Sequence, residues 1–107
     1  IRRMTSSPLR MPMAEFADKA ADVAALLKEL ANEKRLMILC ALLDAKEMTV
    51  TDLALSVKLG QSALSQHLAR LREQNVIRYR REGATLLYSV RDGNVGRILK
   101  TLKSIYC

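Results

Sequence analysis

The segment QSALSQHLARLR, residues 61–72, carries the clearest structural pattern of the chain. Leu64, Leu68 and Leu71 recur within it at i, i+4 and i+7, which is the spacing of one buried face of a helix. The preceding residues Lys58-Leu59-Gly60 are typical of a turn. The sequence therefore predicts a helix that begins at residue 61, directly after a tight connection.

A second short helix is predicted on the other side of that turn. Thr49-Val50-Thr51-Asp52 has the spacing of a capping box, with Asp in place of the usual Glu. The helix that it starts carries apolar side chains at Leu53, Ala54 and Val57. Two short helices joined by a tight turn predict a helix-turn-helix.

The helix at 61–72 presents a polar face opposite its leucines. At 100° per residue, that face and its flank carry Ser62, Ser65, Gln66, Ala69 and Arg70. A helix that enters the major groove of DNA needs small side chains for close approach and amide or guanidinium groups for the base edges. We therefore expect Gln66 and Arg70 to read bases, with an ordinary solvated face as the alternative.

His67 lies at the edge of the apolar side of the same helix. It is the only histidine of the chain, and no cysteine lies near it in sequence. We expect an imidazole that packs between helices or contacts a phosphate, rather than a metal ligand. No nucleophile–base pair and no metal cluster is evident, so we expect no cofactor, no metal and no enzymatic activity.

After Asn75 the apolar period changes from about 3.6 to 2, which predicts a β-hairpin with strands at 76–81 and 86–91. The hairpin is rich in arginine, at Arg78, Arg80, Arg81 and Arg91. A cationic hairpin beside a reading helix fits contact with DNA phosphates, which we expect of Arg78, Arg80 and Arg81. A solvated basic edge that resists aggregation is the alternative.

Further helices are predicted on both sides of this unit. One apolar stripe runs from Phe16 to Leu30, and Asn32 is the expected N-cap of a helix at 33–44. The run at 36–43 is apolar on every side, and its Ala, Leu and Met content favours helix over a buried strand. A last helix begins after Asp92 or Gly93, with its apolar stripe at Val95, Ile98, Leu99, Leu102 and Ile105.

This order predicts a mainly α fold with a β-hairpin, a winged helix-turn-helix that occupies residues 14–107 as one domain. Residues 1–13 are expected to be a flexible tail, or alternatively a basic arm on DNA. Met4 is one of three possible start residues, so residues 1–3 could be an addition to the native chain. The two apolar stripes exceed what a domain of this size can cover, which predicts a homodimer through the first and last helices.

Composition narrows the class of partner. The 107 residues carry a net charge of +7, which favours nucleic acid or an anionic membrane surface. No apolar run approaches the roughly 18 residues of a membrane span, so we expect no membrane protein. Two cysteines are too few for a secreted disulfide scaffold, and there is no signal-peptide core, so we expect a cytoplasmic protein.

Two stretches carry a family resemblance: ELANEKRLMILC at residues 29–40 and QSALSQHLARLR at 61–72. Over residues 18–107 the chain resembles the ArsR/SmtB family of small dimeric bacterial repressors. The resemblance implies binding to double-stranded operator DNA with two-fold symmetry, a dimer built from the first and last helices, and release of the DNA when an inducer is sensed.

The chain departs from the metal-sensing patterns of that family. One branch carries Cys-x-Cys in the helix before the turn, where this sequence has Met48–Leu53. Another places Asp and His ligands along the last helix, and residues 94–106 contain neither. The resemblance therefore gives no support to metal sensing at those sites.

The two cysteines, Cys40 and Cys107, resemble those of the persulfide- and polysulfide-sensing branch of the family, the SqrR/BigR/HlyU-like repressors. That resemblance implies that reactive sulfur species bridge the two thiols, by disulfide or polysulfide, and release the DNA. Without it, Cys40 reads as a small buried hydrophobe. A regulator of this family without a thiol switch, and a winged helix used only for protein interaction, are the alternatives.

Overall fold

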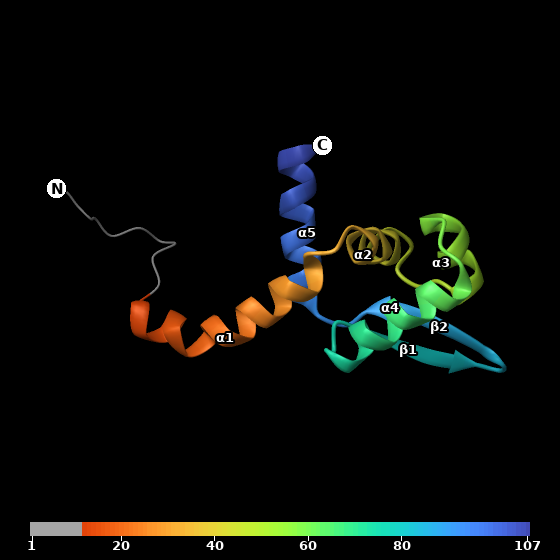
Figure 1. The fold of residues 1–107 in the computed structure, drawn as a ribbon, viewed down its shortest axis with the longest axis horizontal. Helices are drawn as coiled ribbons and strands as arrows, with labels where there is room; N and C mark the ends of the chain where they lie inside the picture. The colour runs from red at the N-terminus through yellow and green to blue at the C-terminus, as the bar shows by residue number, and fades with distance from the viewer. Residues whose placement is uncertain (1–11) are drawn as a thin grey trace.

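Five helices and one β-hairpin make up residues 12–107, the part of the chain that the computed structural model describes (Figure 1). This element order confirms the predicted winged helix-turn-helix. In chain order the elements are α1 (Met13–Leu30), α2 (Glu33–Ala45), α3 (Val50–Val57), α4 (Gln61–Glu73), β1 (Ile77–Glu82), β2 (Thr85–Val90) and α5 (Gly93–Tyr106).

Polar side chains cap three of the helices at the predicted places. The Asn32 side chain accepts a hydrogen bond from the backbone N–H of Arg35, at 3.0 Å, at the start of α2. Thr49 accepts from the N–H of Asp52, at 3.1 Å, at the start of α3. Asp92 does the same for α5. Each cap satisfies a backbone donor that the first helical turn leaves free.

Boundaries differ from the sequence prediction in two places. Helix α1 begins at Met13, about one turn before Phe16, because nothing at residues 13–15 opposes helix formation. The hairpin turn is one residue tighter at each end, since Glu82 pairs directly with Thr85. Gly83 has φ +63° at the first position of this two-residue turn, which is where such hairpins favour glycine. The predicted tail lies, up to residue 11, outside the described residues.

In the turn between α3 and α4, the residue with a positive φ is Lys58 and not Gly60. Lys58 adopts the left-handed conformation, with φ +57°, and closes α3 as its C-cap. Gly60 has an ordinary φ of −68° and is the N-cap of α4. Its lack of a side chain is therefore not required by the backbone conformation.

A single core joins the helix-turn-helix to the hairpin. Helix α2 contributes three of its fully buried side chains, Ile38, Leu39 and Leu42, which confirms that the apolar run at 36–43 is a helix. Met48, just before α3, exchanges two backbone hydrogen bonds with Tyr88 of β2, at 3.0 and 2.8 Å, and so fixes the hairpin to the domain. The buried apolar residues are Leu30, Ile38, Leu39, Leu42, Leu53, Val57, Leu64, Leu68, Leu71, Val76, Ile77, Tyr88, Val95 and Leu99.

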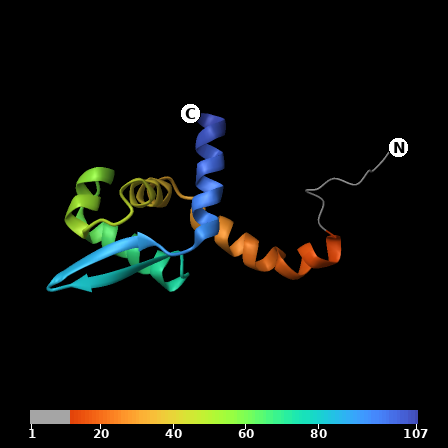
Figure 2. The same ribbon diagram turned by 180° about the vertical axis from the view of Figure 1, so that it is seen from behind.

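Helices α1 and α5 project from this body, and α5 crosses α1 near the C-terminal end of α1 (Figures 1 and 2). The predicted stripe of α1 is exposed over most of its length, including Phe16, Val23 and Leu27. The far end of α5 is also exposed: Ile105 and Tyr106 are 65% and 81% accessible. Both apolar stripes therefore extend beyond what the single chain covers.

Candidate nucleic-acid interface and thiol site

Helix α4 presents the polar face that its sequence predicts. Its leucines are buried in the core, which leaves Ser62, Ser65 and Gln66 exposed on one surface. The side chains there are short or carry an amide, and no bulky apolar group blocks close approach to this surface. Base contacts by these residues stay a prediction, and the exposure that they require is present.

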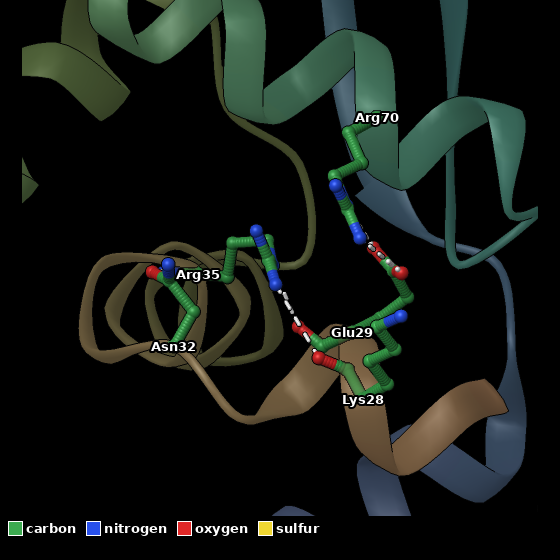
Figure 3. A network of polar contacts seen from close by, with 5 residues as sticks. All are labelled: Lys28, Glu29, Asn32, Arg35 and Arg70. Atoms are coloured by element: carbon green, nitrogen blue, oxygen red, sulfur yellow. Dashed lines mark hydrogen bonds and ion pairs between the residues drawn. The ribbon is translucent and has the colours of Figure 1, made fainter. Parts of the chain in front are cut away.

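Arg70 is on the same helix, but its guanidinium is already bound. Its Nε and Nη2 donate to the two carboxylate oxygens of Glu29 on α1, at 2.8 and 3.1 Å (Figure 3). The Glu29 side chain is only 5% exposed, whereas that of Arg70 is 49% exposed. The hydrogen bonds to Arg70 hold the pKa of Glu29 below its ordinary value. Arg70 can therefore contact a base only if its ion pair with Glu29 opens.

Arg35 of α2 completes this junction and was not singled out from the sequence. Its Nε donates to the backbone carbonyl of Glu29 at 2.7 Å, and its Nη2 donates to that of Lys28 at 3.3 Å. Both carbonyls belong to the last turn of α1, where the helix has no backbone donors left for them. Arg35 thus serves as a side-chain cap that joins α1 to α2, and nothing in its sequence position distinguishes it from other helical arginines.

His67 is half-buried at the edge of α4. Burial lowers its pKa below 6.5, and the positive charge of Arg35 lowers it further. These surroundings favour the neutral form of the imidazole. This favours the packing role over the phosphate contact, since a neutral imidazole brings no charge to a phosphate.

The hairpin arginines are not equivalent. Arg80 binds Glu47 with two hydrogen bonds, at 2.7 and 3.0 Å, and Glu82 with a third at 2.8 Å. These contacts raise the pKa of Arg80 and lower that of Glu47. Within residues 12–107, Arg78 and Arg81 form no ion pair. The two are therefore the hairpin arginines most available to a phosphate.

Two further arginines flank the hairpin. Arg91 donates to the side-chain oxygen of Asn75 at 2.8 Å. The guanidinium of Arg72 lies 4.5 Å from the centre of the Tyr79 ring, which packs the end of α4 against β1. This role of Arg72 is not predictable from the sequence, because a cation–π contact between a helix and a strand has no local signature.

The two cysteines lie on the side of the domain where α2 meets α5. Cys40 of α2 is half-buried and lines a cavity of about 330 Å³ between these helices, together with Leu43, Asp44, Gly96, Leu99, Lys100 and Lys103. Cys107 is exposed directly after α5, and its N–H donates to the carbonyl of Lys103 at 2.8 Å. The ammonium of Lys103 lies 3.7 Å from a carboxylate oxygen of Asp44, which connects the last turn of α5 to α2.

The environment of Cys40 favours the neutral thiol. Burial is the largest effect and raises the pKa of Cys40 above 9.0. Lys103 acts in the opposite direction, while Asp44 and Cys107 raise the pKa further. Both thiols are free.

No group of three potential metal ligands occurs among the described residues. In the same part of the chain, no helix is both long and apolar enough to cross a membrane.

Comparison with known proteins places the chain in a family. Residues 32–79 match the family model described as bacterial regulatory protein, arsR family. The chain is 41% identical over 97 residues to the transcriptional activator HlyU of Vibrio cholerae, covering 91% of this chain and 89% of that protein. It is 45% identical over 102 residues to the nodulation protein NolR of Rhizobium meliloti, covering 95% and 80%.

Solved structures agree. The transcriptional repressor BigR of Xylella fastidiosa matches with a TM-score of 0.84 at 32% identity, over 91% of this chain and 98% of that one. Reduced HlyU of Vibrio cholerae matches with a TM-score of 0.80 at 42% identity, over 87% and 97%. The chain therefore belongs to the arsR family of bacterial regulatory proteins and is a DNA-binding transcriptional regulator.

Proposed function

We propose that this regulator is a homodimeric repressor in the bacterial cytoplasm, and that reactive sulfur species release it from operator DNA by bridging Cys40 and Cys107. One observation carries the proposal. The two free thiols belong to α2 and to the residue directly after α5, and these two helices meet along one cavity that Cys40 lines. Relatives that include BigR and HlyU support the assignment of the family branch.

The chemistry begins at the exposed thiol. The Cys107 thiolate attacks the outer sulfur of a persulfide RSSH, and the thiol RSH leaves with Cys107 persulfidated. The Cys40 thiolate then attacks the Sγ of Cys107, which forms a disulfide and expels hydrosulfide. When both cysteines carry a persulfide, loss of hydrogen sulfide leaves a trisulfide between them, which spans a wider separation.

The DNA contacts follow from which side chains are available. Ser62, Ser65 and Gln66 face the bases from α4, while Arg78 and Arg81 hold phosphates from the hairpin. His67 packs beside the reading surface. Arg80 and Arg70 reach DNA only if their ion pairs open, so neither is a primary contact.

The dimer forms through the exposed apolar stripes of α1 and α5. Phe16, Val23 and Leu27 of α1 and Leu102 and Ile105 of α5 remain exposed in the single chain, and a second copy that packs on both helices buries these side chains. Two-fold symmetry then presents two α4 helices to successive major grooves, about 34 Å apart.

The test uses a duplex that the reduced wild-type chain selects from a random-sequence pool. Affinity for this duplex is measured before and after treatment with glutathione persulfide, for wild type, Cys40→Ser and Cys107→Ser. We expect all three reduced proteins to bind alike and only the wild type to lose affinity on treatment. Zinc serves as the control and should change nothing. If either serine variant releases the duplex as the wild type does, the two-cysteine mechanism is wrong.

A further inference from the structure

Glu29 is a buried carboxylate that the proposed function leaves without a role. It lies in the last turn of α1, and its partner Arg70 lies 41 residues away on α4. Figure 3 shows the Glu29 carboxylate facing the guanidinium of Arg70, with Arg35 reaching the backbone of the same turn from α2. Three helices therefore meet at this one residue.

Burying a carboxylate opposes folding unless charged hydrogen bonds compensate for the lost water. Both oxygens of Glu29 accept from Arg70, so the hydrogen bonds come from α4, and the charges of Arg35 and Lys28 add a smaller stabilisation of the carboxylate. A bidentate guanidinium–carboxylate contact constrains both the relative orientation of the two side chains and the distance between them. The pair therefore fixes how α4 is rotated and placed relative to the end of α1.

The position of α4 relative to α1 is important because the two helices carry different surfaces. Helix α1 carries one of the exposed apolar stripes, and α4 carries the exposed polar face. In a two-fold dimer, the angle between these helices sets the separation and tilt of the two reading helices. A small rotation of α4 would misplace Gln66 from a base edge while leaving nonspecific phosphate contacts in reach.

We propose that Glu29 is a positioning residue for DNA recognition, which acts through Arg70 to hold α4 at the angle that the operator requires. The inference rests on the proposed role of α4 in base reading, and it is independent of the thiol switch. It assigns Arg70 to the scaffold of the interface, so that Arg70 contributes specificity without neutralising a phosphate.

The experiment uses the reduced full chain, the duplex selected by the wild type and a random duplex of equal length. Variants Glu29→Gln, Arg70→Gln and the double variant are compared with wild type, and Arg70→Lys tests partial rescue. Asp18→Asn removes an exposed acid from α1, and Lys34→Gln removes an exposed basic charge from α2. These two controls match the charge changes without touching the pair.

We expect Glu29→Gln and Arg70→Gln each to lower affinity for the selected duplex about tenfold and to leave random-duplex affinity nearly unchanged. The double variant should be no weaker than the weaker single variant, since both remove one interaction. The salt dependence of binding should keep its wild-type slope in Arg70→Gln. A general loss of stability would instead lower both affinities together.

Tighter binding by Glu29→Gln with a steeper salt dependence would overturn the proposal, because Arg70 would then be a phosphate contact that Glu29 withholds. Wild-type specificity in both single variants would overturn it as well. If a single variant fails to fold, as circular dichroism would reveal, the double variant decides, because it leaves no buried charge unpaired. A parallel Gln66→Ala variant reports on base reading by α4 itself, so failure of that premise is seen separately.

Discussion

Arg81 and Arg80 are adjacent in β1 and carry the same charge, yet the structure predicts different effects on DNA binding. Arg80 is held by Glu47 and Glu82, whereas Arg81 forms no ion pair with the described residues. The two side chains also point to opposite faces of the hairpin, as the strand register requires. Replacing Arg81 by Gln should therefore remove a phosphate contact, while Arg80→Gln should mainly release two acids.

The magnitude follows from counterion release. Each phosphate contact contributes about 0.9 to the slope of log affinity against log salt. A dimer with two hairpins loses about 1.8 of slope in Arg81→Gln, because one contact disappears on each side. Between about 50 and 200 mM salt, the wild type should therefore lose about twelvefold more affinity than Arg81→Gln does.

Fluorescence anisotropy of a labelled duplex across this salt range measures the two slopes. Glu47→Gln provides the matched variant, since it removes one of the two acids that hold Arg80 and should steepen the slope rather than flatten it. Equal slope changes in Arg80→Gln and Arg81→Gln would refute the reasoning, because the ion pairs would then have no influence on which arginine meets DNA.

Three other outcomes are expected from single sites. Ile105→Asp places a charge in the exposed stripe of α5 and should yield a monomer at micromolar concentration in sedimentation velocity, whereas an unchanged dimer would exclude this stripe from the interface. Burial lowers the pKa of His67 in the folded protein, so the unfolded chain is protonated at His67 at a higher pH than the folded protein. The contribution of His67 to the free energy of unfolding is therefore greatest above pH 6.5 and falls as the pH drops below that value. His67→Gln should flatten that part of a urea-denaturation pH profile, and an unaltered profile would contradict this. Burial raises the pKa of Cys40 above 9.0, so its alkylation rate, followed by mass spectrometry in Cys107→Ser, should still rise above pH 9.0. Lys103→Gln should move this profile to higher pH, and a shift to lower pH would show that Lys103 does not favour the thiolate.

Local sequence patterns are sufficient to predict much of the fold. The leucine spacing of α4, the caps at Asn32 and Thr49, and the change of period after Asn75 each depend on neighbours within a few residues. The structure confirms all of them. The observed ends of the helices and of the hairpin strands differ from the predicted ends by one to three residues. The first turn of a helix and the last residue pair of a hairpin have little sequence preference, so their positions are hard to predict.

Local sequence patterns do not predict which arginines are free to contact DNA. Sequence places Arg70 on an outward face, and its exposure agrees with that, but its partner comes from a helix 41 residues away. Arg80 is bound by Glu47, 33 residues earlier in the chain. Helical and strand periodicity assign a side chain to a face, whereas the partner that meets it there is set by how the elements pack.

The same packing offers a route by which bridging of the two cysteines would alter the position of α4, the helix proposed to read DNA. The proposed bridge between Cys40 and Cys107 would act between α2 and α5, and α5 crosses α1 near the end where Glu29 holds α4 (Figures 1 and 3). A shift of α5 would then move the end of α1, and the Glu29–Arg70 ion pair would transmit this movement to α4. On this route Glu29→Gln should lower the ratio between reduced and bridged affinities as well as the reduced affinity itself. The ratio in the wild type should be about 5- to 150-fold, the ordinary range for coupling between two sites. An undiminished ratio in Glu29→Gln, measured with the bridge formed by glutathione persulfide and verified by mass spectrometry, would mean that the signal reaches α4 through the core of α2 instead.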